Sequence, residues 1–359
     1  MRVAILCQEE PVFLGPFVRE VVRLRPGAVC AVVVAGSRSA GERRGCPRAR
    51  LEAFRTFWLL FETRGFVDAA WRRARRACLG PHDPTSVERL ARSLGIPVQR
   101  MAARASAQLG RVIERLGADV VLNQSEILLK PDVLAIPRVG FVNRHGSLLP
   151  AHRGRMAAFW AHAAEPPSYG VTIHLVDEGI DTGPILLQRD CPIGSEETAG
   201  EVEKRLSEMG AVLLVETLRG LAAGEITPRP QEIDRETYAP KIRPETARIP
   251  WEREAVSIAN LVRAMSPRPG AATSLGSGHL KIWRVAVGPP RSGDEMVVAP
   301  GTVLPGGSFP RVACGGGGSI VLLELQKEGR GRVSGGEALR GRWLGPGDRF
   351  GEATQAGGE

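Results

Sequence analysis

Residues 140–188 contain two apolar runs with the alternation of β-strands, and each run leads directly into a polar turn. In the first run, the period of two places Asn143 and His145 on the same face of the strand. The second run, residues 170–176, leads into a glycine-flanked turn that holds Asp181. A carboxylate on such a loop can approach the Asn–His pair closely. We therefore expect the three side chains to converge at the strand ends.

Asn, His and Asp in this arrangement suit acyl transfer without a covalent intermediate. The Asn amide and a protonated imidazole can stabilise a developing oxyanion, while the carboxylate orients the imidazole, raises its pKa or accepts a proton through a water. Taken alone, an Asn-x-His pattern also fits two ordinary polar residues at a strand end. The pattern by itself leaves both interpretations open.

The order of motifs in this stretch resembles the folate-dependent formyltransferases. The sequence reads N-x-H-x-S-L-L-P and then R-G, followed by G-V-T-I-H and D-E-G-I-D-T-G-P-I-L. The resemblance implies that N10-formyltetrahydrofolate is the formyl donor, that an acceptor amine attacks its formyl carbon, and that Asn143, His145 and Asp181 are catalytic. His174 and Arg153 are candidate accessory residues, although His174 could also be a strand histidine bonded to backbone.

The resemblance also places the folate-binding residues. In the family, backbone groups at the carboxyl end of a central strand bind the pterin, which requires geometry rather than particular side chains. The candidates lie after the strand predicted at 119–123, after the Asn–His pair, and before the catalytic Asp. They are Ile127, Leu128, Ser147, Leu148, Leu149, Pro150, Asp177, Glu178, Gly179 and Ile180.

The amino-terminal part alternates predicted strands with amphipathic helices, which favours a parallel sheet. No G-x-G-x-x-G follows the first strand, so a nicotinamide-binding loop is not indicated. We predict an α/β, Rossmann-like catalytic domain over residues 1–225. Its strands are predicted at 3–7, 30–35, 96–98, 119–123, 140–145, 170–176 and 184–188, and its helices at 16–24, 87–94, 107–116 and 195–220.

An unusual segment at residues 38–80 interrupts this domain. Its first part is rich in Arg and its second part in large apolar residues. Methionyl-tRNA formyltransferases have a shorter, Lys/Arg/Pro-rich loop here that contacts tRNA, so the segment departs from them. Its composition fits either a helical hairpin that covers the sheet edge or a flap that binds the acceptor or a partner.

The remaining chain is long enough for a second domain. Residues 226–250 are too rich in Pro for a regular element and are predicted to be a linker. Within them, T-Y-A-P-K-I resembles the segment that joins the two domains of methionyl-tRNA formyltransferases, and L-Q-K-E-G further on matches their second domain. After a helix at 251–265, short strands separated by Gly and Pro favour a small open, OB-like β-barrel at 251–350. These strands are predicted at 280–285, 296–298, 301–304 and 320–325, and residues 351–359 as a disordered tail.

Charge and cysteine content constrain the partners only broadly. The formal charge of +9 would suit an anionic partner such as RNA, but the Arg residues are spread widely and a coding bias would look the same. The six cysteines form no C-x-x-C pair, so we expect neither disulfides nor a metal site. No apolar run approaches the roughly 20 residues of a membrane helix. We expect a cytoplasmic monomer or dimer without membrane contact.

Two classes of acceptor amine remain open. The second domain and the positive charge favour charged initiator tRNA, to which we give a slight preference. The run R-G-R-M-A-A-F-W at 153–160 favours a small-molecule amine, such as a nucleotide-linked amino sugar or an amino acid, because methionyl-tRNA enzymes usually read R-G-A-A-P here. A formyltetrahydrofolate hydrolase would use the same trio. A non-catalytic folate- or RNA-binding relative would have no physical need for it.

Overall fold

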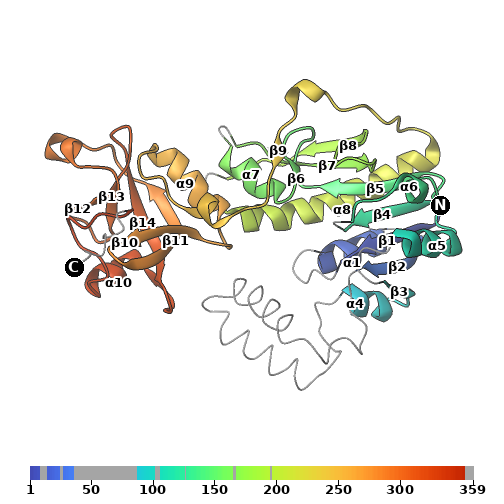
Figure 1. The fold of residues 1–359 in the computed structure, drawn as a ribbon, viewed down its shortest axis with the longest axis horizontal. Helices are drawn as coiled ribbons and strands as arrows, with labels where there is room; N and C mark the ends of the chain where they lie inside the picture. The colour runs from blue at the N-terminus through green and yellow to red at the C-terminus, as the bar shows by residue number, and fades with distance from the viewer. Residues whose placement is uncertain are drawn as a thin grey trace, which may run out of the picture.

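The computed structural model describes residues 1–8, 14–24, 27–35, 87–101, 106–125, 127–164, 167–194 and 196–351. The predictions for the segment at 38–80 and for residues 352–359 of the tail lie outside the described residues. Two lobes follow one another along the longest axis of the molecule, an α/β lobe with the amino terminus and a β-rich lobe with the last described residues (Figure 1).

A seven-stranded sheet forms the α/β lobe, in the order β3-β2-β1-β4-β5-β7-β8. Its strands are β1 Val3–Cys7, β2 Val29–Ala35, β3 Val98–Met101, β4 Val120–Gln124, β5 Gly140–His145, β7 Gly170–Leu175 and β8 Ile185–Asp190. The first five in this order are parallel, but β7 is antiparallel to both β5 and β8. The predicted Rossmann-like parallel sheet is confirmed, and β7 and β8 extend it with antiparallel pairing at one edge. Between β5 and β7 lies α7 (Ala157–Ala163), which packs against both α8 (Ala199–Ala223) and, in the other lobe, α9 (Ala255–Ala264).

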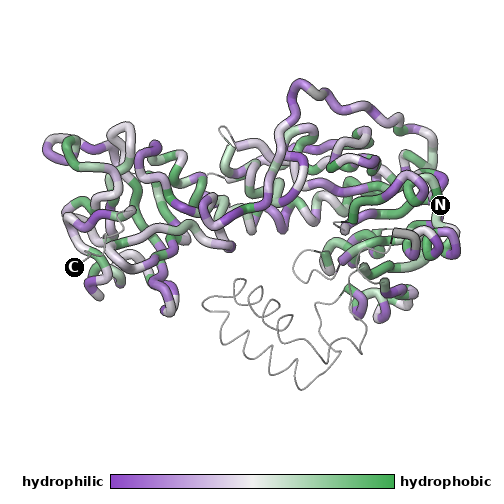
Figure 2. Tube along the Cα trace, in the orientation of Figure 1, coloured by the Kyte–Doolittle hydropathy of each residue, from purple (hydrophilic) through white to green (hydrophobic). Residues whose placement is uncertain are grey.

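Helices cover both faces of this sheet, as the apolar stripes predict. On one face, α1 (Leu14–Leu24) packs against α8 (Ala199–Ala223), and on the other lie α5 (Ser106–Leu116) and α6 (Pro131–Leu134). Helix α4 (Val87–Ser93) lies near β2 and β3 at the edge. Helix α8 starts later than predicted, because Thr198 and Glu201 form a reciprocal capping box at its first turn. Hydrophobic residues are concentrated along the central strands of both lobes (Figure 2).

The second lobe is a curled antiparallel sheet in the order β10-β11-β14-β13-β12, with β15 paired to β14. The main-chain bridges from Leu275 to Phe350 and from Thr302 to Arg349 connect its two edges into a small barrel. The predicted strand at 296–298 is wrong: these residues belong mostly to the 3-10 helix η4 (Gly293–Val297), and Val297 is 87% exposed, with no strand beside it to bury it. The bounds are β10 Ala271–Leu275, β11 Gly278–Val287, β12 Val303–Leu304, β13 Arg311–Ala313, β14 Ser319–Lys327, β15 Arg332–Ser334 and α10 Gly335–Arg340.

The proline-rich connection between the lobes contains short regular elements, contrary to the prediction. Besides the 3-10 helices η2 (Ile233–Arg235) and η3 (Pro244–Ala247), it forms strand β9 (Tyr238–Ala239), which pairs in parallel with β6 (Arg153–Gly154). Proline occupies neither residue of β9, which leaves both main-chain amides of this short stretch able to pair. Arg229 and Arg248 of the connection also form isolated bridges, to Ile185 and to Ala272. We call residues 229–240 the strap, because they run back along the α/β lobe before the chain enters the second lobe (Figure 1).

We propose residues 1–225, 226–250 and 251–350 as catalytic domain, linker and carboxyl-terminal domain. Helix α7 joins the two lobes, since Phe159 belongs to the apolar core of the barrel lobe. None of the helices in the described part of the chain has the length and apolarity that a membrane crossing needs.

Candidate active site

The side chains of Asn143, His145 and Asp181 meet, as the sequence predicts. Asn143 and His145 lie on the same face of β5, and the loop between β7 and β8 brings Asp181 to them. Asn143 Nδ2 donates to Asp181 Oδ1 at 3.2 Å, and His145 Nδ1 lies 3.4 Å from Asp181 Oδ2. The geometry can therefore combine an amide donor, an imidazole and a carboxylate on one substrate.

The local backbone fixes Asp181 in place. Its φ is 53°, in the left-handed region that Asp tolerates better than most residues. The amide of Gly154 in β6 donates to Asp181 Oδ2 at 2.9 Å, and Gln231 Nε2 in the strap donates to the carbonyls of Asp181 and Gly183, both at 2.8 Å. Two segments distant in sequence thus hold this loop.

Asp181 is ionised at neutral pH. Burial alone would raise its pKa, but the two histidines beside the carboxylate, His174 at 3.5 Å and His145 at 3.4 Å, and the amide of Gly154 outweigh burial and lower the pKa to about 2. A charged carboxylate therefore faces His145.

His145 is buried, with 6% of its surface exposed. Its Nε2 lies 2.9 Å from the carbonyl oxygen of His152, which can only accept, so Nε2 carries the hydrogen in the neutral ring. We expected Asp181 to raise the pKa of the imidazole, and it does, but burial lowers the pKa more, so that the net shift is downward from 6.5. The sequence could not indicate this sign, because it depends on how much water the loops exclude.

His174 lies on the strand next to Asn143 and joins the same cluster. Its Nδ1 donates to the carbonyl of Leu175 at 2.8 Å, which leaves Nε2 of the neutral ring to accept from Asn143 Nδ2 at 3.1 Å. The same Nε2 is 3.5 Å from Asp181 Oδ1. His174 is thus bonded to backbone and is also next to two of the trio.

Comparison with known proteins identifies the family of this chain. The family profile described as formyl transferase matches residues 70–218, and the profile for the formyl transferase carboxyl-terminal domain matches residues 241–342. The methionyl-tRNA formyltransferase of Aromatoleum aromaticum is 38% identical over 273 residues, which cover 76% of this chain and 84% of that relative. This chain belongs to the formyltransferase family. The methionyl-tRNA formyltransferase of Pelotomaculum thermopropionicum is 36% identical, with 75% of this chain and 85% of the relative covered. As a member of this family, the present chain is an enzyme of formyl transfer that uses formyl-tetrahydrofolate.

Solved structures share the fold of this formyltransferase. The N-formyltransferase from Helicobacter canadensis, in complex with folinic acid and dTDP-3-aminofucose, superposes with a TM-score of 0.56 at 15% identity, covering 91% of this chain and 100% of that one. A HypX variant from Aquifex aeolicus gives 0.54 at 14% identity, covering 100% of this chain and 50% of that one. At such low identity the likeness concerns the fold alone.

The predicted folate-binding segments of the formyltransferase differ in exposure. Leu128 and Ile180 are 68% and 46% exposed on loops after β4 and β7, while Ile127 is half-buried. In the turn before Asp181, Glu178 and Gly179 are exposed, and Asp177 Oδ1 closes the turn by accepting from Thr182 Oγ1 at 2.6 Å.

The segment after β5 has mainly buried side chains. Ser147 is fully buried and donates to the carbonyl of Ala151 at 2.6 Å, and Leu149 is 3% exposed, with its amide bonded to Thr172 Oγ1 at 3.0 Å. Leu148 and Pro150 are half-buried. Ligand contacts from this segment are therefore restricted mostly to backbone, and its folate-binding role stays a prediction.

Arg153, the second predicted accessory residue, reaches away from the trio. Its guanidinium pairs with Glu236 of the strap at 2.7 Å, and the neighbouring amide of Gly154 makes the contact with Asp181. Gln124 and Gln231 were missed by the sequence analysis. Gln124 ends β4 beside Asn143, so the rule that parallel sheets bind ligands beyond their carboxyl ends could have pointed to it. No sequence signal marks Gln231 within the Pro-rich strap.

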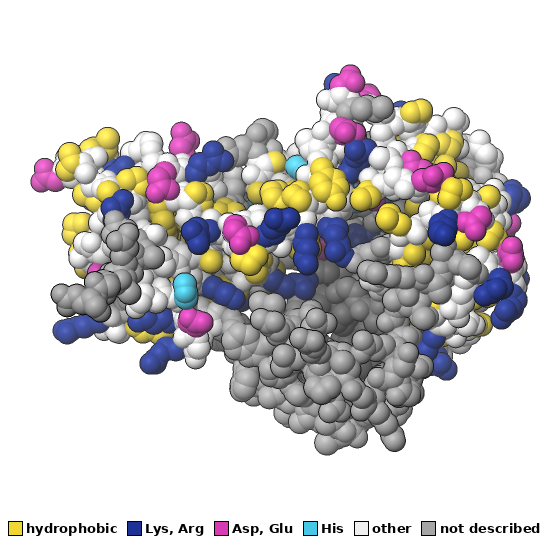
Figure 3. Space-filling view, viewed as in Figure 1, with side chains coloured by type: hydrophobic (Ala, Val, Ile, Leu, Met, Phe, Trp, Pro, Cys, Tyr) yellow, Lys and Arg dark blue, Asp and Glu magenta, His cyan; other side chains and the backbone are white. Residues whose placement is uncertain are grey.

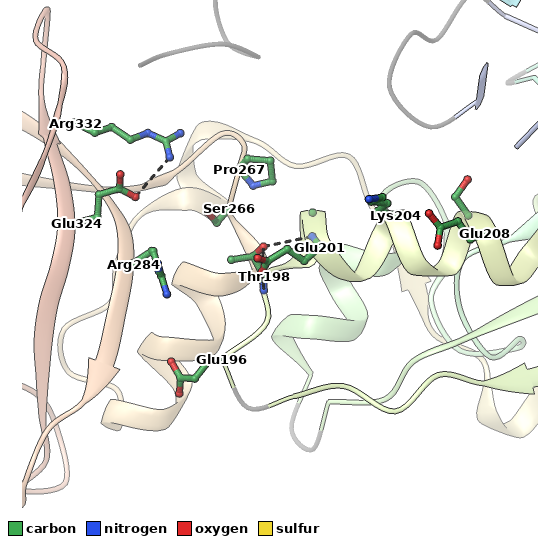
Figure 4. A pocket seen from close by; sticks show the side chains of 12 residues that line it. Glu196, Thr198, Glu201, Lys204, Glu208, Ser266, Pro267, Arg284, Glu324 and Arg332 are labelled. Carbon is green, nitrogen blue, oxygen red and sulfur yellow. Dashed lines mark hydrogen bonds and ion pairs between the residues drawn. The ribbon is translucent and has the colours of Figure 1, made fainter. Parts of the chain in front are cut away.

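A groove of about 560 Å³ is lined by residues of both lobes (Figure 4), and none of the trio lines it. Lys204, Arg284 and Arg332 line it, and Lys and Arg side chains gather along the middle of this face of the molecule (Figure 3). Four glutamates share the groove, so its charge is mixed. Within the described ranges, no three His, Cys, Asp or Glu side chains gather as metal ligands.

Proposed function

We propose that this formyltransferase transfers the formyl group of N10-formyltetrahydrofolate to the amino group of charged initiator methionyl-tRNA. The observation that carries the proposal is the match of both domains to relatives named methionyl-tRNA formyltransferase, at 36–39% identity over about three quarters of this chain. The net charge of +9 is compatible with a polyanionic acceptor.

The alternative of a small-molecule amine rested on the run R-G-R-M-A-A-F-W. Phe159 in this run is 2% exposed within the core of the barrel lobe, and Trp160 Nε1 donates to the carbonyl of Pro240 at 2.8 Å. Both aromatic residues therefore have a structural explanation in the packing of the lobes. A sugar acceptor is not needed to account for them, which supports the tRNA acceptor.

We assign the chemistry to the trio. Bound folate supplies the formyl carbon that the amine attacks. The Nδ2 of Asn143 stabilises the negative charge that develops on the formyl oxygen. Unprotonated His145 Nδ1 accepts the proton that the amine loses, directly or through a water, and passes it to the leaving nitrogen when the carbon–nitrogen bond of the donor breaks. Ionised Asp181 stabilises the imidazolium in between.

This assignment predicts an acid limb in the pH profile. Because the pKa of His145 lies below 6.5, the ring accepts a proton above that pKa and is blocked below it. We expect the single-turnover rate to be flat from pH 7 upward and to fall as the pH drops through a value below 6.5. Rapid-quench assays at saturating donor and acceptor measure it. A rate that rises with acidity would contradict a neutral resting imidazole.

The acceptor can be decided by one comparison. The protein is assayed with charged initiator tRNA, nucleotide-linked amino sugars and free amino acids, each at two salt concentrations. We expect formylation of the tRNA, with an affinity that falls steeply with salt because phosphate neutralisation releases counterions. A salt-indifferent reaction with an amino sugar would refute the tRNA acceptor, and release of formate without any amine would indicate a hydrolase. Folate affinity at both salt concentrations is the control.

A further inference from the structure

We propose that Arg144 is a positioning residue that acts through Gln124 to fix the direction in which the Asn143 amide points. The inference rests on the proposed role of Asn143 in formyl transfer. Arg144 stands between Asn143 and His145 in β5, so it lies on the opposite face of the sheet from the trio. Arg144 therefore cannot contact the trio directly, and it can affect the site only through residues at the end of a strand.

The side chain of Arg144 is firmly packed. Only 13% of it is exposed, and its guanidinium lies 5.5 Å from the centre of the Phe17 ring in α1. Its stem occupies the space beside Gly210 in α8, where an added Cβ would lie 2.4 Å from Arg144 Cδ. The direction of the guanidinium is thus set by two helices.

Electrostatic pairing satisfies the guanidinium of Arg144 only in part. Among the described residues it forms one long ion pair, from Nη2 to Glu203 Oε1 at 3.9 Å, and its buried Nη1 has no hydrogen-bond partner there. A buried guanidinium that is incompletely bonded costs free energy. In the described part of the chain, the guanidinium of Arg144 donates one hydrogen bond to a side chain, that of Gln124, which in turn contacts Asn143.

A continuous set of hydrogen bonds connects Arg144 to the trio. Arg144 Nε donates to Gln124 Oε1 at 3.3 Å, and Gln124 Nε2 donates to Asn143 Oδ1 at 3.0 Å and to the carbonyl of Asn123 at 2.8 Å. Every polar atom of the Gln124 side chain is used. The chain of contacts passes around the carboxyl end of β4.

The residues at the two ends of this series of hydrogen bonds determine which group donates and which accepts in each bond. A guanidinium only donates, so Gln124 turns its oxygen to Arg144 and its NH2 group to Asn143. The Asn143 oxygen then faces Gln124, and its NH2 group faces Asp181, which only accepts when ionised. In the reversed orientation, the Asn143 carbonyl would meet the carboxylate. Arg144 thus reinforces, from one end, the orientation that Asp181 favours from the other, in which the Asn143 NH2 group faces the site.

The test compares matched variants in single-turnover assays with saturating donor and acceptor. Arg144→Met keeps the length but not the donor, and we expect the rate to fall about tenfold, comparable to one ordinary hydrogen bond. The KM for the formyl donor should change little. Arg144→Lys keeps a donor-only group and should restore most of the rate. Arg138→Met, an exposed Arg paired with Asp119, is the control.

A double-mutant cycle shows whether Arg144 acts through Asn143. In an Asn143→Ala background, Arg144→Met should have no further effect on the rate. Additive losses, or an unchanged rate in Arg144→Met alone, would overturn the proposal. If Arg144→Met does not fold, Gln124→Glu replaces it in the cycle, since its carboxylate accepts from Arg144 but cannot donate to Asn143. Full activity of Asn143→Ala by itself would instead overturn the proposed catalytic site.

Discussion

Asp181→Asn should slow the chemical step of formyl transfer by at least about 10²–10³-fold, as large as the loss of an oxyanion donor. The substitution keeps the shape of the side chain but removes the charge that faces His145 Nδ1 at 3.4 Å. The imidazolium that forms during proton transfer then has no counter-charge in a buried site. Asn143, which donates to Asp181 Oδ1, also loses its ionic acceptor.

Single-turnover rates and folate dissociation constants of the variant measure this effect. Folate affinity should stay close to that of the unchanged protein, because we assign the pterin to backbone near Ile127 and Leu128. Asp190→Asn, at the exposed end of β8, is the matched control. Near-normal turnover of Asp181→Asn would show that the catalytic centre is misplaced.

Asp181 also contributes to stability. Its pKa is lowered from 3.8 to about 2, so the contribution is fully present above pH 3.8 and is lost as the pH falls through about 2. The shift corresponds to about 2 kcal/mol. The kinetic comparison should accordingly be made well below the unfolding temperature of the variant.

His145→Ala should reduce the chemical step by at least as much as Asn143→Ala, and combining it with Asp181→Asn should add little. In the proposed mechanism His145 and Asp181 act as one proton-transfer unit, so removing either already disables both. The same rate and affinity measurements apply to the two single variants and the double variant. His279→Ala, on the exposed side of β11, is the control.

Two results would contradict this second prediction. If the losses of the two single variants multiply in the double variant, His145 and Asp181 work independently. If His145→Ala greatly weakens folate binding, the imidazole contacts the donor rather than handling a proton.

The sequence predicted those parts of the site that depend on local pattern. The period of two placed Asn143 and His145 on one face, and the glycine-flanked turn gave Asp181 the freedom to reach them. Contacts between segments distant in sequence could not be predicted. Gln231 lies 50 residues from Asp181, and only the folded strap brings them together. The pKa of His145 likewise depends on burial by loops rather than on its neighbours in sequence.

For the fold, too, the features set by local sequence pattern were predictable, and those set by contacts between distant segments were not. Strand β1 and the stripe of α1 were predictable from short-range periodicity, whereas the direction of β7 is not, because the alternation of apolar residues is the same in parallel and antiparallel strands. The run at 296–298 has the apolar residues of a strand. It lacks a neighbouring strand to pair with, which periodicity alone does not reveal.

The strap determines where the two lobes of this enzyme can be separated when domains are exchanged between relatives. Thr237 accepts from the amides of His152 and Arg153 through its Oγ1 and carbonyl, at 2.8 and 2.9 Å, and Gln231 holds the Asp181 loop. A chimera that exchanges barrel lobes between relatives at residue 225 would leave the catalytic loops with foreign supports. A joint placed after Ala239 would carry these supports with the α/β lobe. The α/β lobe therefore needs residues up to Ala239 to keep the supports of its loops. In sequence, these residues look like part of the linker.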